Sequence, residues 1–516
     1  MSGNPIFVSR RWFIGGASAF GALGAFGGNR FVRLPGFRKD GVPKLRFGVL
    51  SDIHIKGYDN SGKKLKVGIW NQTVRHALEW YRDQGVDAVV IAGDLADNSL
   101  IEELQFLADT WEAVFPGDRA SDGRKVERIF VYGNHDEAGN NFAVSHYPDL
   151  KERAKYALLP DYGGWWERIF HEEYRPIYRK DVKGYAFIGA HWDHGEWRPG
   201  GKRVDPYALI GPYLAEHGKD LDPNLPFFYI QHPHPKDTCY GPWAWGHDTG
   251  ASTAALLRFP NAIAISGHSH YSLTDERSVW QGAFTSVGAA SLWFVASPEN
   301  QRAPAGYENS NAIGSAQWRT DAMKMMPAFH PWGCRQGMLW SVYDDCIVMK
   351  RREFQVDLDV GDDWVLPLPA AEPKPFAFAA RAKRIAAPEF PEGARITVEP
   401  VTAKNRGGRS RDGKERVEAV EQPAYGVVFP AVRPVNGARV MDFEVTAENR
   451  KGKTLVKHVL CEGFHQPIGH EAVGRPGRCV FSAAELPDGE FRVRVTPRNC
   501  FGKCGRALVS DWIARS

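Results

Sequence analysis

Short apolar runs alternate with amphipathic segments over the first two thirds of the chain. Residues 45–50 and 88–92 form short, mostly apolar runs of the kind that makes a buried strand. Between these runs, apolar residues recur with helical spacing from Val67 to Tyr81. Strands that alternate with helices in this way predict an α/β domain built of β-sheets flanked by helices. The same pattern predicts further strands over 128–132, 185–189, 227–231 and 262–266, and further helices over 100–115 and 252–257.

The pattern changes towards the C-terminus. A strand pair over 336–355, turning at Asp344 and Asp345, is expected to close the α/β domain. The Pro- and Ala-rich stretch 366–375 is typical of an extended linker. Beyond Pro391, short alternating strands without a long helix predict a separate all-β sandwich. The expected strands are 394–398, 439–447, 454–460, 478–481 and 490–496, and the run 485–495 with 499–502 resembles the closing strands of a fibronectin type III domain.

The N-terminus carries a pattern of its own. Arg10 and Arg11 precede a weakly apolar, Gly- and Ala-rich run to Gly28, and this arrangement resembles a twin-arginine export signal. The resemblance implies that the twin-arginine export machinery is a partner and that the protein is periplasmic or extracellular. A disordered basic tail and a short membrane anchor are the alternatives, although the run is shorter than the ~20 residues that a spanning helix needs. No small-x-small cleavage site is recognisable, so retention of this segment stays open. The predicted organisation is a signal and linker at 1–43, an α/β domain at 44–358, a linker at 359–391 and an all-β domain at 392–516.

Composition and charge narrow the choice of partners only slightly. The chain has 65 Lys and Arg against 61 Asp and Glu, and its formal charge of +4 gives no reason to expect nucleic-acid or anionic-membrane binding. A basic stretch at 404–416 is interrupted by Gly, Ser and acidic residues, so it is interpreted as a solvated loop.

Seven cysteines are too few to form a disulfide scaffold for a chain of this length. A disulfide is plausible among the four C-terminal cysteines, whereas the other three are interpreted as packed thiols; these sets are Cys461, Cys479, Cys500 and Cys504, and Cys239, Cys334 and Cys346.

Polar side chains that can bind metal follow most of the predicted strands. Asp52 and His54 come directly after the first strand, and alternate residues of an extended strand point the same way, so this pair is a candidate metal clamp. Because ligands normally gather beyond the carboxyl ends of strands, one edge of one sheet is expected to collect these side chains. Carboxylate oxygens, imidazole nitrogens and an amide oxygen together suit borderline or hard divalent cations. The other clusters are Gly93-Asp94, Gly133-Asn134-His135-Asp136, His232 and Gly267-His268-Ser269-His270.

These motifs, in this order and each after a predicted strand, resemble those of the calcineurin-like metallophosphoesterases over residues 45–355. The resemblance implies the α/β sandwich of that superfamily and two divalent ions, with Asp94 bridging both. It assigns one ion to Asp52, His54 and His270, and the other ion to Asn134, His232 and His268. The two histidines that stand two positions apart can serve two ions only if the chain turns between them, which Gly267 permits. Mn, Fe, Zn and Ni all accept this ligand set, so the ions are not identified.

The same resemblance implies hydrolysis by in-line attack of a metal-bridging hydroxide on phosphorus. His135 is then the catalytic residue, which either donates a proton to the leaving oxygen or stabilises the charge that develops on the phosphoryl group. Asp136 either orients its ring or caps the following turn. Asp97 is close enough in sequence to the bridging aspartate to touch a ligand, but helix N-capping explains it equally well. His191 and His194 are candidates to line the pocket, and three tryptophans are candidates for a stacking wall against an organic leaving group: Trp192, Trp243 and Trp245. Packing is the more frequent role for all five. His234 is an alternative ligand to His232.

The sequence therefore predicts a metal-dependent phosphoric ester hydrolase of class EC 3.1 with a phosphate-ester substrate. A phosphodiester is slightly favoured, because no Arg cluster awaits a doubly charged terminal phosphate. No tyrosine follows the bridging aspartate, so the iron–tyrosinate site of purple acid phosphatases is not expected. A phosphomonoesterase or nucleotidase is the alternative among enzymes, and an exported binding protein with a vestigial metal site is the alternative of another class. The aromatic-rich segments 136–185 and 293–335 are expected to shape the groove around the ions.

Overall fold

Two mixed β-sheets, each with parallel and antiparallel strands, form the first part of the structure. The computed structural model describes residues 41–515 except for 59–63, 65–70, 140–141, 197–199, 299–333, 405–407, 410–415, 418–419 and 433–438. The expected export signal, the start of the first helical pattern at Val67 and Trp70, and most of segment 293–335 lie outside the described residues.

The first sheet carries three of the strands that precede the metal-binding motifs. β1 (Leu45–Leu50) runs parallel to β2 (Ala88–Ala92), which runs parallel to β3 (Glu127–Val131), so their carboxyl ends lie at one edge. The strand pair expected over 336–355 is confirmed as β10 (Gln336–Val342) and β11 (Cys346–Glu353), and β10 lies antiparallel beside β1. Two short strands complete the sheet on β11, namely β12 (Leu358–Asp359) and β13 (Trp364–Pro367).

The second sheet carries the remaining motif strands. β5 (Tyr185–Ala190), β6 (Phe227–Ile230) and β7 (Ala262–Ser266) are parallel neighbours. The sheet continues with β4 (Ile177–Val182) on one side and with β9 (Thr285–Gly288) and β8 (Val279–Gln281) on the other. The expectation that one sheet collects all the motifs is therefore wrong. Alternation along the chain shows which segments are strands, but it does not show which strands pair.

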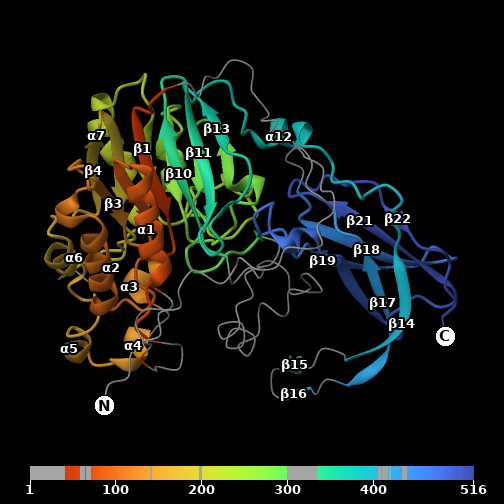
Figure 1. Ribbon diagram of the computed structural model, residues 1–516. Coiled ribbons are helices and arrows are strands. Elements are labelled where there is room, and N and C mark those ends of the chain that lie inside the picture. The colour runs from red at the N-terminus through yellow and green to blue at the C-terminus, as the bar shows by residue number, and fades with distance from the viewer. Residues whose placement is uncertain are drawn as a thin grey trace, which may run out of the picture. The chain divides into compact units, whose positions relative to one another are not determined.

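The two sheets pack face to face, and helices cover their outer faces (Figure 1). The ring of Phe47 on β1 lies 5.2 Å from that of Phe187 on β5 and 4.9 Å from that of Phe228 on β6. The outer face of the first sheet packs on α1 (Gln72–Gln84), α2 (Ile101–Val114) and α6 (Tyr162–Phe170). The outer face of the second packs on α7 (Ile210–His217) and α8 (Ala251–Leu256). The predicted α/β architecture, with sheets flanked by helices, is confirmed.

Shorter helical elements lie in the connections between these strands and helices. They are α3 (Asn134–Ala138), α4 (Phe142–His146), α5 (Leu150–Arg153), and the 3₁₀ turns Pro116–Asp118, Pro206–Leu209, Gly218–Asp220, Glu276–Ser278 and Glu471–Gly474. Among the described residues, none of the helices combines the length and apolarity that crossing a membrane requires.

Two further antiparallel sheets follow in the C-terminal part. One contains β14 (Thr397–Lys404), β17 (Glu421–Phe429) and β20 (Gly477–Ser482), and the other contains β19 (Thr454–Leu460), β18 (Asp442–Asn449), β21 (Phe491–Arg498) and β22 (Leu508–Val509). Their inner side chains, among them Val427, Val445 and Val493, share one apolar cluster. A separate two-stranded ladder joins β15 (Gly408–Arg409) to β16 (Arg416–Val417). β17 was not expected, since Pro423 interrupts its alternating pattern.

The range expected to be a linker contains regular structure. β13 pairs with β11, and α12 (Phe378–Arg384) follows it. A Pro-rich composition did not exclude β13, because it is paired on one side and Pro367 stands at its last position. The disulfide considered for the C-terminal cysteines is not formed, and the cysteines of the described residues carry thiols.

Candidate metal centre and active site

Left-handed backbone turns place five of the seven predicted ligands. The residues and their φ angles are Asp52 (49°), His54 (45°), Asp94 (51°), His268 (68°) and His270 (56°). Non-glycine residues rarely adopt this conformation, and where they do they cluster at functional sites. β1 ends at Leu50, so the prediction that Asp52 and His54 project from one extended strand is wrong. A turn brings them together instead.

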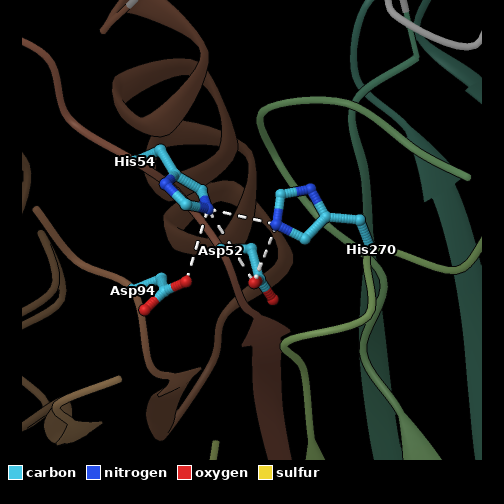
Figure 2. Close-up of side chains that lie close together, drawn as sticks. All are labelled: Asp52, His54, Asp94 and His270. Atoms are coloured by element: carbon cyan, nitrogen blue, oxygen red, sulfur yellow. Dashed lines mark hydrogen bonds and ion pairs between the residues drawn. The ribbon is translucent and has the colours of Figure 1, made fainter. Parts of the chain in front are cut away.

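The first ligand group consists of Asp52, His54, Asp94 and His270, whose ligand atoms all lie within 4.8 Å of one another (Figure 2). His54 Nε2 is 3.1 Å from His270 Nε2 and 3.5 Å from Asp94 Oδ2. His270 Nε2 is 3.0 Å from Asp52 Oδ1, and that oxygen, although buried, has no hydrogen-bond partner among the described residues. Imidazole nitrogens and carboxylate oxygens that converge in a buried space without saturating hydrogen bonds fit a divalent cation.

The second group consists of Asp94, His232 and His268, joined by Asn134. His232 Nε2 lies 3.2 Å from Asp94 Oδ2, 3.0 Å from Asn134 Oδ1 and 3.2 Å from His268 Nδ1. Asp94 is therefore common to both groups, and its Oδ2 faces a histidine nitrogen of each. One carboxylate between two sets of ligands is the arrangement that a pair of ions requires.

Backbone contacts between the two sheets fix this arrangement. His232 is oriented by its Nδ1, which lies 2.8 Å from the carbonyl oxygen of Ala92 on β2. The Gly267 N–H donates to the His232 carbonyl at 2.7 Å, and the His268 N–H donates to Asp52 Oδ2 at 2.9 Å. A Cβ at Gly267 would overlap the hydroxyl oxygen of Ser51. Gly267 therefore provides room for close approach, whereas the left-handed turns expected of it are made by the histidines themselves.

Asp97 orients two of the histidines. Its Oδ1 lies 2.9 Å from His54 Nδ1, which leaves His54 Nε2 directed at the first group. Its Oδ2 lies 2.9 Å from Lys56 Nζ, and both side chains are almost fully buried. Its carbonyl oxygen lies 2.9 Å from His135 Nδ1. Asp97 therefore contacts a ligand, as one of its two interpretations held. Lys56 was missed, because a single lysine after the Asp52-Ile53-His54 motif gives no sequence signal of burial.

The contacts of Asp136 differ from the ring-orienting role considered for it. Its carboxylate accepts hydrogen bonds from the backbone N–H groups of Gly133 at 2.7 Å, Ala96 at 2.7 Å and Leu95 at 3.1 Å. It thus holds the turn after β3 against the turn after β2, in line with the turn-capping alternative. The contact that orients the His135 ring comes from Asp97 instead. The His135 N–H also donates to Asp94 Oδ1 at 2.8 Å, which places this histidine beside the shared carboxylate.

Residues 45–272 match the family model described as calcineurin-like phosphoesterase. This range contains every residue of the two ligand groups.

Over residues 45–272, the chain is similar to the calcineurin-like phosphoesterases.

Comparisons with whole proteins give weaker similarities. No curated protein matches the chain. A dimetal phosphatase structure from Danio rerio has 13% identity and a TM-score of 0.35, with 63% of this chain and 99% of that chain covered. A purple acid phosphatase from yellow lupin (Lupinus luteus) seeds has 13% identity and a TM-score of 0.34, with 63% and 54% covered. Vps29 from Entamoeba histolytica, complexed with zinc, has 10% identity and a TM-score of 0.26, with 63% and 99% covered. Similarities of this size carry no argument about function.

Burial and neighbouring charges shift the pKa values of the buried groups of the metal centre. Burial acts to raise the pKa of Asp52, but the charges of His270 and His232 lower it to about 2. Burial acts to lower the pKa of His232, but Asp94 and Asp52 raise it to about 9. Burial and neighbouring His232 lower the pKa of His268 to about 3. Without metal, the Asp52 carboxylate is therefore ionised and the His232 imidazole protonated, whereas the His268 imidazole is neutral and available to a cation.

The other candidate histidines have hydrogen-bond partners of their own. His234 is not available as a ligand, because its two ring nitrogens lie 2.7 Å from the hydroxyl oxygens of Ser266 and Ser269. His191 accepts a hydrogen bond from the Tyr132 N–H at 3.0 Å and packs among aromatic rings, which is the structural role expected as the more frequent one. His194 Nδ1 lies 2.7 Å from Glu137 Oε2, within hydrogen-bonding distance.

Tryptophans border both ligand groups. Trp245 and Trp192 lie beside the ring of His268, whereas Trp243 lies near Arg277. Trp293 lies 4.5 Å from the His54 ring, between ring centroids, and was not singled out from the sequence. Its place at the start of an aromatic-rich segment expected to shape the groove was the available signal.

Proposed function

We propose that the protein is a dinuclear-metal-dependent phosphoester hydrolase that prefers phosphodiesters. The observation that carries the proposal is the position of Asp94, whose Oδ2 faces His54 Nε2 of one ligand group at 3.5 Å and His232 Nε2 of the other at 3.2 Å. Two divalent cations held by these groups would lower the pKa of bound water and neutralise charge on phosphoryl oxygens. Asp52, His54, Asp94 and His270 would hold one ion, and Asp94, Asn134, His232 and His268 the other.

Side chains around the ions would then orient the His135 ring and transfer the proton. The Asp97 carbonyl fixes Nδ1 of His135, so Nε2 is left to give a proton to the leaving oxygen. Burial acts to lower the pKa of His135, but Asp94 and Asp97 outweigh it and the pKa lies above its ordinary value. A raised pKa favours the protonated ring, which is the form that a general acid requires. Asp136 keeps the turn that carries His135 in place.

The charge available around the site supports the proposed preference for diesters. Lys56 brings a positive charge to this cluster, but that charge is already paired with Asp97 at 2.9 Å. A terminal phosphate carries an additional negative charge that normally recruits unpaired Arg or Lys side chains. A phosphomonoesterase is therefore the second choice.

The location and the C-terminal part enter the proposal as well. The Arg10-Arg11 pattern supports export by the twin-arginine route to a periplasmic or extracellular location. The two C-terminal sheets share one apolar cluster, which supports an all-β sandwich as an accessory domain.

Metal analysis combined with hydrolysis tests the enzyme proposal. Protein loaded with Mn, Fe, Zn or Ni should bind two ions per chain and hydrolyse bis(p-nitrophenyl) phosphate faster than p-nitrophenyl phosphate. Asp94→Asn should reduce metal content and activity together. The matched control is His76→Gln, which alters an exposed histidine paired with Asp357 and should change neither. Two bound ions without turnover of either substrate would refute the proposal and favour the binding-protein alternative.

A further inference from the structure

One end of the metal centre is bordered by two tryptophans of different character. The Trp245 ring stacks on the His268 ring with 4.5 Å between centroids and 26° between planes. The Trp192 ring lies 5.8 Å from the same histidine, and its Nε1–H donates to Glu137 at 3.0 Å. Trp192 is half-buried, whereas Trp245 is 53% exposed. One face of the Trp245 indole is thus covered by a candidate metal ligand, while much of the ring remains open to solvent.

The loop that carries Trp245 is held against the ligand turn by its backbone. The His234 N–H donates to the Gly246 carbonyl at 2.8 Å, and the Asp248 N–H donates to the His234 carbonyl at 2.8 Å. Gly246 has a φ of +93°, and a Cβ there would lie 3.0 Å from the Cβ of Ser269. The loop therefore packs directly on the residue between the two histidine ligands of that turn. A single exposed tryptophan needs no special explanation, but an exposed ring that stacks on a candidate metal ligand, on a loop held by backbone hydrogen bonds, is a fixed surface beside the metal centre.

We propose that Trp245 is a stacking platform for a planar organic group of the phosphate ester, such as an aryl group or a nucleobase. This inference rests on the proposed function and names its substrate class. An indole offers a large rigid surface that stacks on any planar ring at low cost in conformational entropy. His135, the candidate proton donor, borders the other end of the centre, where its ring lies 4.5 Å from that of His54. The group on Trp245 is therefore the ester group that phosphorus retains, and a retained ester group exists only in a diester.

Binding of two phosphonates to the metal-loaded protein tests the platform without requiring turnover. Phenylphosphonate carries a planar group and methylphosphonate does not, while both present the same charged head to the ions. Calorimetry should show tighter binding of phenylphosphonate to the wild-type protein. Trp245→Leu should weaken the binding of phenylphosphonate by about 5- to 100-fold, which is the range for losing one ring–ring stack. The affinity for methylphosphonate should stay unchanged. Trp245→Phe should keep most of the preference for phenylphosphonate. The control is Trp243→Phe, which alters a tryptophan on the same loop that lies near Arg277, and this variant should keep the whole preference.

The binding and hydrolysis experiments test the stacking platform and the proposed function independently. Wild-type protein that hydrolyses aryl diesters but binds both phosphonates equally overturns the platform and leaves the proposed function standing. Equal weakening of both phosphonates in Trp245→Leu also overturns it, because the ring would then act only through His268. A phenyl preference that disappears in Trp245→Leu supports the platform even if no substrate is hydrolysed, in which case only the proposed function fails.

Discussion

Substitutions in the buried ion pair between Lys56 and Asp97 can distinguish effects on stability from effects on metal binding. The two charges are 2.9 Å apart, and their side chains are 2% and 0% exposed. Removing one partner of such a pair leaves an uncompensated buried charge, which costs about 3–5 kcal/mol. We therefore expect Lys56→Met and Asp97→Asn each to lower the free energy of unfolding of the metal-free protein by about this amount. Urea unfolding measures both changes.

The two substitutions should differ in their effect on the metals. Asp97 also orients His54 through a contact of 2.9 Å, whereas Lys56 contacts that aspartate and not the ligand. Asp97→Asn should therefore weaken metal affinity by about 10- to 100-fold, the usual range for a partner that orients a histidine ligand. Lys56→Met should leave the affinity close to that of the wild type. Competition with a chelator gives both values.

The double variant gives the decisive result. With Lys56→Met and Asp97→Asn combined, no unpaired charge remains, so most of the lost stability should return while metal affinity stays low. The exposed pair of Lys64 and Glu102, 3.5 Å apart, is the matched control, and Lys64→Met should cost no more than about 1 kcal/mol. Additive losses in the double variant, or unchanged metal affinity in Asp97→Asn, would refute the reasoning.

Three further predictions concern the site itself. His135→Gln should lower kcat by about 10²–10⁴-fold while two ions remain bound, because the residue moves a proton without holding metal; equal loss of metal and turnover would contradict this role. Gly267→Ala should remove metal binding, since its Cβ would overlap Ser51, and an active variant would show that the close approach is not needed. The pKa of His232, raised to about 9 by Asp94 and Asp52 against the effect of burial, means that the metal-free ring is protonated at pH 7 and must lose that proton on metal binding. Metal affinity should therefore rise with pH up to about 9, by up to about tenfold per unit, and calorimetry in buffers of different ionisation enthalpy should detect the released proton; a flat profile would contradict the shift.

The hydrophobic pattern was sufficient to place the strands that precede the metal-binding motifs. β1, β2 and β7 begin and end where the predicted runs do, β5 and β6 differ by one residue at their last position, and β3 is displaced by one residue at both ends. Continuous apolar runs of four to six residues have few alternatives in a domain that alternates strand and helix. The pattern was weaker in the C-terminal part, where β17 escaped notice because Pro423 breaks its alternation.

Strand pairing was beyond the reach of the pattern. The motifs were expected at the edge of one sheet, yet β1, β2 and β3 belong to one sheet and β6 and β7 to another. Nothing in a local apolar run specifies its partner strand, because any buried strand offers the same backbone hydrogen bonds. The ligand turns show the same limit: left-handed φ values at Asp52 and His268 arise from contacts with distant segments, not from local preference.

The sequence by itself determined the chemistry of the site. Aspartates, histidines and one asparagine, each placed just after a strand, could be recognised because residue type and spacing are properties of the chain alone. Only the tertiary structure decided that Asp97 orients His135 while Asp136 holds backbone, and that Lys56 is buried at 2.9 Å from Asp97. Those contacts join residues on different turns, and they depend on how two sheets meet, which no local pattern encodes.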